Sequence, residues 1–468
     1  MNHTADTTKR VAAVIAALSS FLAPFMGFSV TVALPSIGRE FSMDAILLGW
    51  VATAYSLVAA MFLIPFGKAG DIYGRKKIFT YGMAVYTFAS LLCALATSGG
   101  LLIAFRVLQG IGSTMIFGTG VAILTSVFPA EERGRALGLN VAATYSGLSL
   151  GPVLGGLLTE HFGWRSVFIA NVPIGLIVII LVLWKLRPEW AEAKGETLDY
   201  VGSVVYGLSL VATMYGFSQL PAPLGIGLTL TGILGLALFV GWEMRAESPI
   251  LNVNLFKNNA AFTFSNLAAL INYSATTAVG FLLSLYLQYI KGMTPRDAGL
   301  ILVAQPVVMA ILSPLAGRLS DKIESRTIAS AGMGLTALGL LLLIFLGEQT
   351  TLGFVIFSLI LLGSGFGLFS SPNVNAVMSS VERRFYGVAS AVLGTMRLVG
   401  QTLSMGFITL IFALYIGKVE ITPETYPLFL TSVKTVFVVS AVLCLGGIFA
   451  SLARGKSKSV TRQPTGKT

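Results

Sequence analysis

The chain has 468 residues, of which 55% are hydrophobic and only 11% are charged; its mean hydropathy is +0.83 and its formal net charge is +11. In soluble domains about a quarter of all residues are charged. A water-soluble fold therefore cannot hide this much apolar surface. Apolar stretches of about 20 residues, enough to cross a bilayer as a helix, recur along the chain, and their length and lack of alternation exclude membrane strands. The composition predicts an all-α polytopic membrane protein.

We expect about fourteen transmembrane helices. In chain order the predicted spans are residues 11–35, 46–66, 78–97, 100–127, 134–160, 164–186, 200–220, 223–243, 260–290, 296–316, 327–347, 351–372, 385–416 and 427–453. The pair at 200–243 has two interpretations, because the Gly and Pro residues from Leu220 to Gly225 fit either a tight turn or one broken element.

Lysine and arginine are unevenly distributed between the two sides of this topology. With a cytoplasmic N-terminus, the external loops contain only Arg39, Arg165, Lys291, Arg296 and Lys418, a strong positive-inside bias. Both termini are then cytoplasmic, and we expect a multi-pass protein of the cell (cytoplasmic) membrane. The positive charge is explained by this topology and by anionic inner-leaflet lipid, so we expect no nucleic-acid partner.

Cysteine and histidine indicate no metal site. Cys93 and Cys444 lie in separate spans, where isolated thiols are packing residues, and His3 and His161 lie at a terminus and a loop edge. We therefore expect neither a metal centre nor a histidine proton relay within the membrane.

A charged, glycine-rich loop after the second span has a counterpart in the second half of the chain. Gly67 to Lys77 reads Gly-Lys-Ala-Gly-Asp-Ile-Tyr-Gly-Arg-Lys-Lys, and Gly317 to Arg326 reads Gly-Arg-Leu-Ser-Asp-Lys-Ile-Glu-Ser-Arg. This echo indicates two related bundles that rock around a central site. The predicted units are an N-terminal six-helix bundle (1–189), two inserted transmembrane helices (190–250), a C-terminal six-helix bundle (251–455) and a basic cytoplasmic tail (456–468).

The fourth and fifth spans each contain a distinctive pattern. Arg106 and Gln109 lie about one turn apart, and a charge inside the membrane costs about 2.5–3.5 kcal/mol, which favours a cavity role over the alternative of a helix-locking donor to backbone carbonyls. In the fifth span, a helix-packing motif of small residues clears one helix face for close approach, and its proline permits a kink. The motif consists of Gly147, Gly151, Pro152, Gly155 and Gly156.

Together with the segment from Trp164 to Gly175, these motifs resemble those of the major facilitator superfamily, and in particular its fourteen-helix drug:proton antiporter family. The resemblance covers nearly the whole chain. It implies that Arg106 takes part in proton transfer, that Gly147 to Gly156 form the antiporter motif, and that residues 200–243 are an insertion between two six-helix halves. It also implies a cytoplasmic gate whose carboxylate bridges to a neighbouring helix in the outward-facing state. The gate residues are Gly67, Asp71, Gly74 and Arg75, with a weaker second copy at Asp321, Lys322 and Arg326.

The first span departs from this family. Aligning Ala33-Leu34-Pro35 with the end of the family pattern places Met26 where a membrane aspartate belongs, and no Asp or Glu lies near the centre of any other span. Proton-coupled export of cationic drugs through that position is therefore not expected, because a thioether does not titrate.

The polar residues within the spans suggest a different cavity. Arg397 and Gln401 echo Arg106 and Gln109 in the other half, and two guanidiniums without a membrane carboxylate favour an anionic or neutral amphipathic solute. The other members of the predicted cavity are Asn266, Asn272, Gln305, Asn373, Asn375 and Met26. For each Asn or Gln alone, an interhelical hydrogen bond is the alternative.

The predicted function is transport by alternating access, with export of amphipathic or drug-like small molecules. A facilitator or organic-anion carrier without carboxylate proton coupling is the first alternative, and a transport-dead sensor or scaffold is the second. No nucleotide loop, metal cluster or nucleophile–base spacing indicates an enzyme. We expect a monomer in a lipid bilayer that binds a small-molecule substrate, needs no cofactor and, where transport is coupled, uses the proton-motive force.

Overall fold

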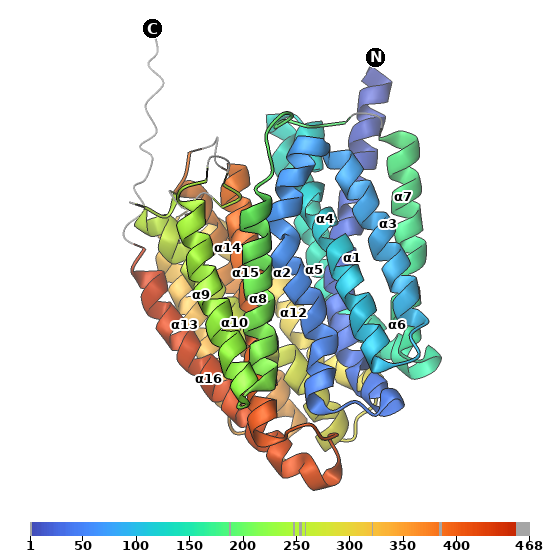
Figure 1. Ribbon diagram of the computed structural model, residues 1–468, viewed down its shortest axis with the longest axis vertical. Coiled ribbons are helices and arrows are strands. Elements are labelled where there is room, and N and C mark those ends of the chain that lie inside the picture. The colour runs from blue at the N-terminus through green and yellow to red at the C-terminus, as the bar shows by residue number, and fades with distance from the viewer. Residues whose placement is uncertain are drawn as a thin grey trace.

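The computed structural model describes residues 2–186, 189–246, 249–251, 255–257, 259–320, 322–382 and 386–454. Within them lie fourteen helical spans long and apolar enough to cross a membrane, and the predicted all-α membrane fold is confirmed (Figure 1). The first part contains α1 (Asn2–Phe41), α2 (Ala45–Tyr73), α3 (Arg75–Ala94), α4 (Gly99–Val127), α5 (Ala130–Phe162), α6 (Arg165–Ile169), α7 (Asn171–Lys185), α8 (Tyr200–Gln219) and α9 (Pro223–Glu243).

The second part begins with α10 (Ala260–Leu285), which continues as a π-helical turn (Tyr286–Ile290). It is followed by α11 (Pro295–Leu302), α12 (Ala304–Leu319), α13 (Ser325–Leu343), α14 (Leu352–Ser379), α15 (Tyr386–Tyr415), a 3₁₀ turn (Pro423–Thr425) and α16 (Tyr426–Leu452).

Two predicted spans are each interrupted by a short break. The span at 164–186 divides into α6 and α7, and the span at 296–316 divides into α11 and α12. Pro173 and Pro306 follow the two breaks and have no backbone N–H to continue the ladder of helical hydrogen bonds. In contrast, residues 200–243 form two separate helices joined by a tight turn, which decides between the two interpretations of that segment.

Close helix contacts depend on the glycines of the fifth span. A Cβ atom on Gly151 would lie 3.0 Å from the Phe25 carbonyl oxygen, and one on Gly155 would lie 2.7 Å from Ser29 Cβ, so α1 and α5 meet backbone to backbone. Gly156 faces another helix, because a Cβ there would lie 2.9 Å from Arg296 Cα at the start of α11. The motif thus places α5 against both halves of the molecule.

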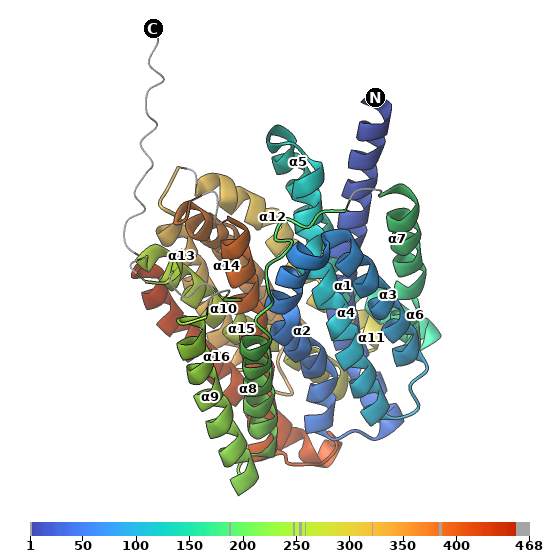
Figure 2. The ribbon, with the colours of Figure 1, turned by 45° about the horizontal axis from the view of Figure 1, so that its top comes forward.

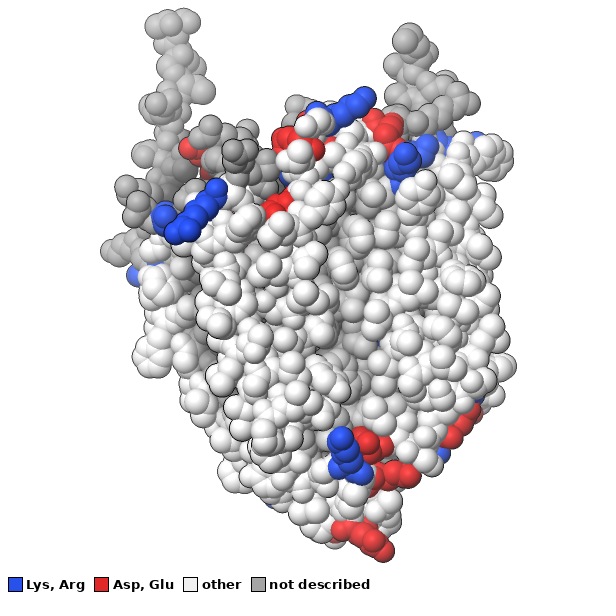
Figure 3. All heavy atoms as spheres, in the orientation of Figure 1, with Lys and Arg blue, Asp and Glu red and all other residues white. Residues whose placement is uncertain are grey.

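The helices run between two charged ends of the molecule. We call the end at Gly74, between α2 and α3, the gate-loop end, and the end at Asp44, between α1 and α2, the Asp44 end. On the face drawn in Figure 3, acidic and basic side chains lie at these two ends and a wide band between them lacks both. This band matches the hydrocarbon layer that the spans would cross.

The helices α8 and α9 pack on each other, and α8 also contacts α2 and α15 (Figures 1 and 2). The Tyr206 hydroxyl donates a hydrogen bond to the Ala60 carbonyl of α2 (3.1 Å). The inserted pair therefore covers a seam between helices from the two predicted bundles. The boundaries predicted for the bundles, and the basic tail at 456–468, remain predictions; the tail lies outside the described residues.

Candidate functional site

The two halves are joined by hydrogen bonds that gather toward the Asp44 end. Ser284 Oγ donates to the Thr31 carbonyl (2.8 Å), and Gln288 Nε2 donates to the Val32 carbonyl (2.9 Å). Two further bonds at this end run from Ala45 N to the Val419 carbonyl (3.1 Å) and from Arg296 N to Glu160 Oε2 (3.2 Å). These contacts close the Asp44 end of the interface.

Halfway along α5, one more hydrogen bond links the halves. The Tyr145 hydroxyl donates to Ser313 Oγ on α12 (2.7 Å). Toward the gate-loop end, the ion pairs of Lys9 with Glu132, Lys68 with Glu196 and Arg75 with Glu192 each stay within the N-terminal part of the chain. The hydrogen bonds described between the halves therefore lie at the Asp44 end and halfway along α5.

Arg397 of α15 lies half-buried on the C-terminal side of this interface, beside Tyr273 of α10. The Arg397 guanidinium carbon is 5.7 Å from the centre of the Tyr273 ring, and Arg397 Nε is buried without a hydrogen-bond partner. No carboxylate pairs with it among the described residues. An incompletely satisfied cation within a span is costly, so this position is the candidate site for a ligand.

Aromatic rings complete the surroundings of Arg397. Phe366 of α14 packs edge-on against Tyr273 with ring centres 5.2 Å apart, and Tyr145 of the other half lies close enough to Tyr273 to interact with it electrostatically. We call Arg397, Tyr273, Phe366, Tyr145 and Ser313 the Arg397 cluster. Sequence reasoning predicted only Arg397, because Tyr, Phe and Ser are ordinary packing residues in a span and carry no distinguishing signal there.

Arg106 occupies a different environment from Arg397. It is only 2% exposed; its Nε donates to the Val51 carbonyl (3.0 Å), its Nη1 donates to Gln109 Oε1 (2.5 Å), and the Tyr55 ring centre lies 4.5 Å from its guanidinium carbon. Gln109 Nε2 in turn donates to Ser90 Oγ (2.8 Å). This geometry matches the alternative in which the arginine locks helices by donating to a backbone carbonyl, and it does not pair Arg106 with Arg397 around one cavity.

The other predicted cavity residues fall into two groups. Gln305, Asn375 and Gln401 are half-buried, and Asn375 Nδ2 donates to Ser320 Oγ (2.6 Å). The second group is almost fully enclosed by neighbouring helices and does not face open space in this conformation; it consists of Met26, Asn266, Asn272 and Asn373. In this group Asn266 Nδ2 donates to the Phe262 carbonyl (2.9 Å), whereas both amide atoms of Asn272 lack a partner.

At the gate-loop end, Arg75 is the centre of a polar network. Its Nε donates to Asp71 Oδ1 (2.7 Å), and its Nη1 donates to Ser126 Oγ (2.8 Å). Nη1 and Nη2 also donate to the two carboxylate oxygens of Glu192 (2.8 and 2.9 Å). Asp71 thus binds within its own half in this conformation and does not reach the other bundle.

Glu192 belongs to residues 189–196, which lie across the gate loop and which we call the linker strap. Glu196 pairs with Lys68, and Glu189 Oε1 accepts from the backbone N–H of Lys76 (2.9 Å). Backbone bonds from Arg75 N to the Trp190 carbonyl (2.8 Å) and from Ala193 N to the Asp71 carbonyl (2.9 Å) hold the strap in place. Sequence reasoning missed the strap, although its acidic residues at three- and four-residue intervals beside a basic loop were a signal.

Gly74 and Gly67 allow the gate loop this shape. Gly74 has φ +115°, in the region that favours glycine, and a Cβ there would lie 2.7 Å from Glu189 Oε1. Gly67 lies where α2 meets α4, with its N atom 3.0 Å from a Cβ placed on Gly118. In the second copy of the loop, Asp321 lies outside the described residues, Lys322 is exposed, and Arg326 Nε donates to Glu324 Oε2 (2.7 Å).

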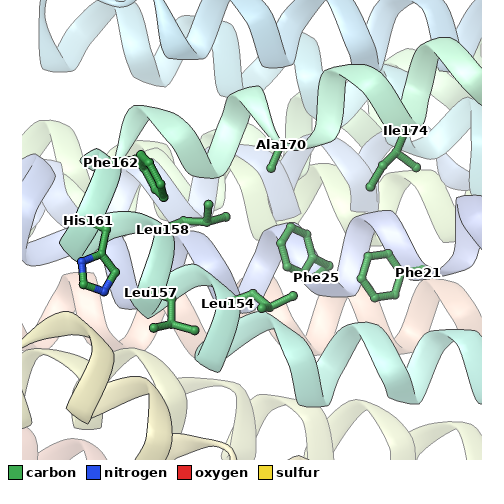
Figure 4. Close-up of a pocket in the computed structure, with 9 residues that line it drawn as sticks. All are labelled: Phe21, Phe25, Leu154, Leu157, Leu158, His161, Phe162, Ala170 and Ile174. Atoms are coloured by element: carbon green, nitrogen blue, oxygen red, sulfur yellow. The ribbon is translucent and has the colours of Figure 1, made fainter.

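A separate apolar pocket lies on α1, α5, α6 and α7, away from the Arg397 cluster (Figure 4). It is lined by Phe21, Phe25, Leu154, Leu157, Leu158, His161, Phe162, Ala170 and Ile174. His161, near the Asp44 end of α5, is the one polar side chain in this lining, so the pocket offers little to orient a charged ligand.

The family model of the Major Facilitator Superfamily matches residues 16–249 and 266–468. The chain is 30% identical over 405 residues to the riboflavin transporter RibZ of Clostridioides difficile, covering 86% of this chain and 88% of RibZ. It is 31% identical over 419 residues to the multidrug resistance protein Stp of Mycobacterium tuberculosis (88% and 77% covered), and 33% identical over 408 residues to the cephamycin export protein CmcT of Amycolatopsis lactamdurans (84% and 83% covered).

Solved structures show the same fold. A bacterial homolog of the human lysosomal transporter Spinster superposes with a TM-score of 0.71 at 16% identity, covering 96% of this chain and 97% of that one. The resemblance to the fourteen-helix drug:proton antiporter family is confirmed by relatives that include the multidrug resistance protein Stp and the multidrug efflux pump LfrA of Mycolicibacterium smegmatis. The chain belongs to the Major Facilitator Superfamily.

Proposed function

We propose that this transporter is an alternating-access exporter of amphipathic or drug-like small molecules, and that its substrates are anionic or neutral. The observation that carries the substrate class is Arg397, a guanidinium within a span that has no carboxylate partner among the described residues. An uncompensated cation gives its surroundings a positive potential, which attracts anions and opposes cations.

The Arg397 cluster offers suitable chemistry for such a solute. A guanidinium presents a planar fork that binds a carboxylate or phosphate with two hydrogen bonds. The Tyr273 and Phe366 rings beside it provide apolar faces for the rest of an amphipathic molecule. The relatives named as a riboflavin transporter and a cephamycin export protein support a carrier of organic molecules, whereas the multidrug names support a broad substrate range.

Two features support alternating access. The halves are linked by hydrogen bonds at the Asp44 end, and the gate loop is bound by a strap of its own half at the other end. With both termini cytoplasmic, the gate-loop end faces the cytoplasm, where an exporter would load its substrate. We place the protein in the cell membrane as a monomer that needs no bound cofactor.

Flux in liposomes tests the proposal. Purified protein is first screened for thermal stabilisation by matched anionic, neutral and cationic amphiphiles, and the best ligand is then followed with imposed pH and voltage gradients. Arg397→Ala should abolish stabilisation by anions and slow their transport at least tenfold, while Arg397→Lys should restore part of both because it keeps the charge but not the fork.

The outcomes separate the candidate functions. Flux down the solute gradient alone indicates the facilitator, and absence of flux with every stabilising ligand indicates the sensor or scaffold. Preferential stabilisation by cations, unchanged in Arg397→Ala, would exclude the anionic-site proposal. Leu398→Ala is a matched control on the same helix, outside the Arg397 cluster, and should leave anion binding intact.

A further inference from the structure

Two carboxyl groups meet at the gate-loop end of the inserted helices, outside the Arg397 cluster. Asp199 is the N-cap residue of α8, and Glu243 is the last residue of α9. Asp199 Oδ2 and Glu243 Oε1 lie side by side against Gly202. Gly202 makes room for both, because a Cβ there would lie 2.6 Å from Glu243 Oε1 and would collide with Asp199 Oδ2.

One carboxyl oxygen of this pair, Glu243 Oε1, has no hydrogen-bond donor. Glu243 is 3% exposed, and its Oε2 accepts from the backbone N–H of Leu251 (2.7 Å), whereas its Oε1 is buried without a hydrogen-bond partner. The backbone N–H of Ile250 lies near the same carboxyl group. Asp199 Oδ1 accepts from Gly202 N (2.8 Å) and its Oδ2 accepts from Trp242 Nε1 (2.8 Å). The oxygen without a donor, Glu243 Oε1, is the one that lies beside Gly202 together with Asp199 Oδ2.

No described cation neutralises the two carboxylates. Lys68 of the adjacent α2 pairs with Glu196, and the Tyr73 hydroxyl of α2 lies 3.2 Å from the hydroxyl of Tyr200. Arg245, just beyond α9, forms no ion pair with Asp199 or Glu243 within the described residues. Two neighbouring carboxylates repel each other when both are ionised, and the burial of Glu243 adds to the cost of its charge.

We propose that Asp199 and Glu243 together bind one proton, which completes a hydrogen bond between their facing oxygens. The shared proton fastens α9 to α8 and, through Glu243 Oε2 and Leu251 N, fastens the chain that leads to α10. This carboxyl pair lies at the membrane edge and requires no transported substrate, so the proposal is independent of the substrate class of the Arg397 cluster.

Infrared spectroscopy of the purified full-length protein in lipid measures the proton directly. An ordinary glutamate or aspartate is fully ionised above about pH 6. We expect the wild type to keep one protonated-carboxyl C=O band above that pH, and we expect Glu243→Gln and Asp199→Asn each to lose it. Both variants retain hydrogen-bonding shape, and asparagine is as good an N-cap as aspartate. Glu424→Gln, at an exposed carboxylate of the opposite end, is the control and should keep the band.

Thermal unfolding provides a second measurement. Since the proton relieves repulsion between the two groups, wild-type stability should fall as the pH rises and the band disappears, whereas Glu243→Gln should show no fall over the same range. Absence of the band above about pH 6 in the wild type would overturn the proposal whether or not the variants fold. A band that persists in both folded variants would overturn it as well.

Discussion

Arg75 of α3 and Glu192 of the linker strap form a two-pronged ion pair, with N–O distances of 2.8 and 2.9 Å. Arg75 also binds Asp71, so the gate loop and the strap are joined through one guanidinium. Asp71 and Glu192 both precede the inserted helices in the chain. The charged groups of the gate loop thus bind partners in their own half, whereas the hydrogen bonds between the halves lie toward the opposite end.

Breaking this ion pair should favour the state in which the gate-loop end closes. Glu192→Gln removes a partially exposed pair that contributes about 1 kcal/mol, which corresponds to about a fivefold change in the ratio of the two states. Spin labels at Lys77→Cys and Lys322→Cys, two exposed positions on opposite halves, report the distance across this end after the buried Cys93 and Cys444 are replaced. We expect a larger fraction of molecules in which the two labels lie close together. Glu424→Gln, at the other end, should leave the distribution unchanged.

Asp71→Asn should act in the opposite direction. If Asp71 bridges to the neighbouring bundle in the outward-facing state, its loss weakens that state more than this one, where Arg75 keeps both bonds to Glu192, and the label pair should show fewer short distances. Anion binding at the Arg397 cluster should not change. A shift of both variants in the same direction, or no shift together with normal transport, would mean that the gate loop has only a topological role.

Arg106 and Arg397 should respond differently to truncation. Arg106→Ala leaves the Val51 carbonyl and the Gln109 amide oxygen without their buried donor, and each unsatisfied group costs about 1–3 kcal/mol. We therefore expect a lower unfolding temperature for Arg106→Ala, and a nearly wild-type one for Arg397→Ala, whose guanidinium makes none of the hydrogen bonds described here. Thermal unfolding in detergent measures both. Equal stability of the two variants would contradict the assignment of Arg106 to a structural network.

Met26 should not support proton-coupled efflux of lipophilic cations. The wild type is expected to show weak efflux of quaternary ammonium dyes, with no change when the pH gradient is collapsed, because a thioether does not titrate. Strong, gradient-driven efflux would show that protons couple elsewhere.

Substitutions of Met26 also test whether this side chain is buried. Met26 is 0% exposed and lies in the largest apolar core, so Met26→Asp should be clearly less stable at neutral than at acidic pH, since a buried charge is costly without a partner. Met26→Leu, of similar volume, should cost less than about 1.5 kcal/mol at either pH. Equal stability of Met26→Asp at both pH values would show that this position reaches water.

The sequence by itself determined the number and approximate bounds of the spans, because hydrophobic length is a local property that the bilayer imposes on each helix separately. It also determined the small-residue face at Gly151 and Gly155, since only missing side chains permit backbones to approach so closely. The breaks before Pro173 and Pro306 also have a local cause, but they were not predicted. A proline within a span can produce either a kinked continuous helix or a break, and its sequence position does not say which.

Only the tertiary structure decided what the polar residues do. Arg106 and Arg397 have similar sequence neighbourhoods, yet one is enclosed by Val51 and Gln109 and the other lies beside Tyr273 with an unpaired nitrogen. The strap on Arg75 and the meeting of Asp199 with Glu243 likewise join residues that are 117 and 44 positions apart. Hydropathy records how apolar a helix is, but the partner that satisfies a buried charge is set by which helices pack around it, and that depends on the whole chain.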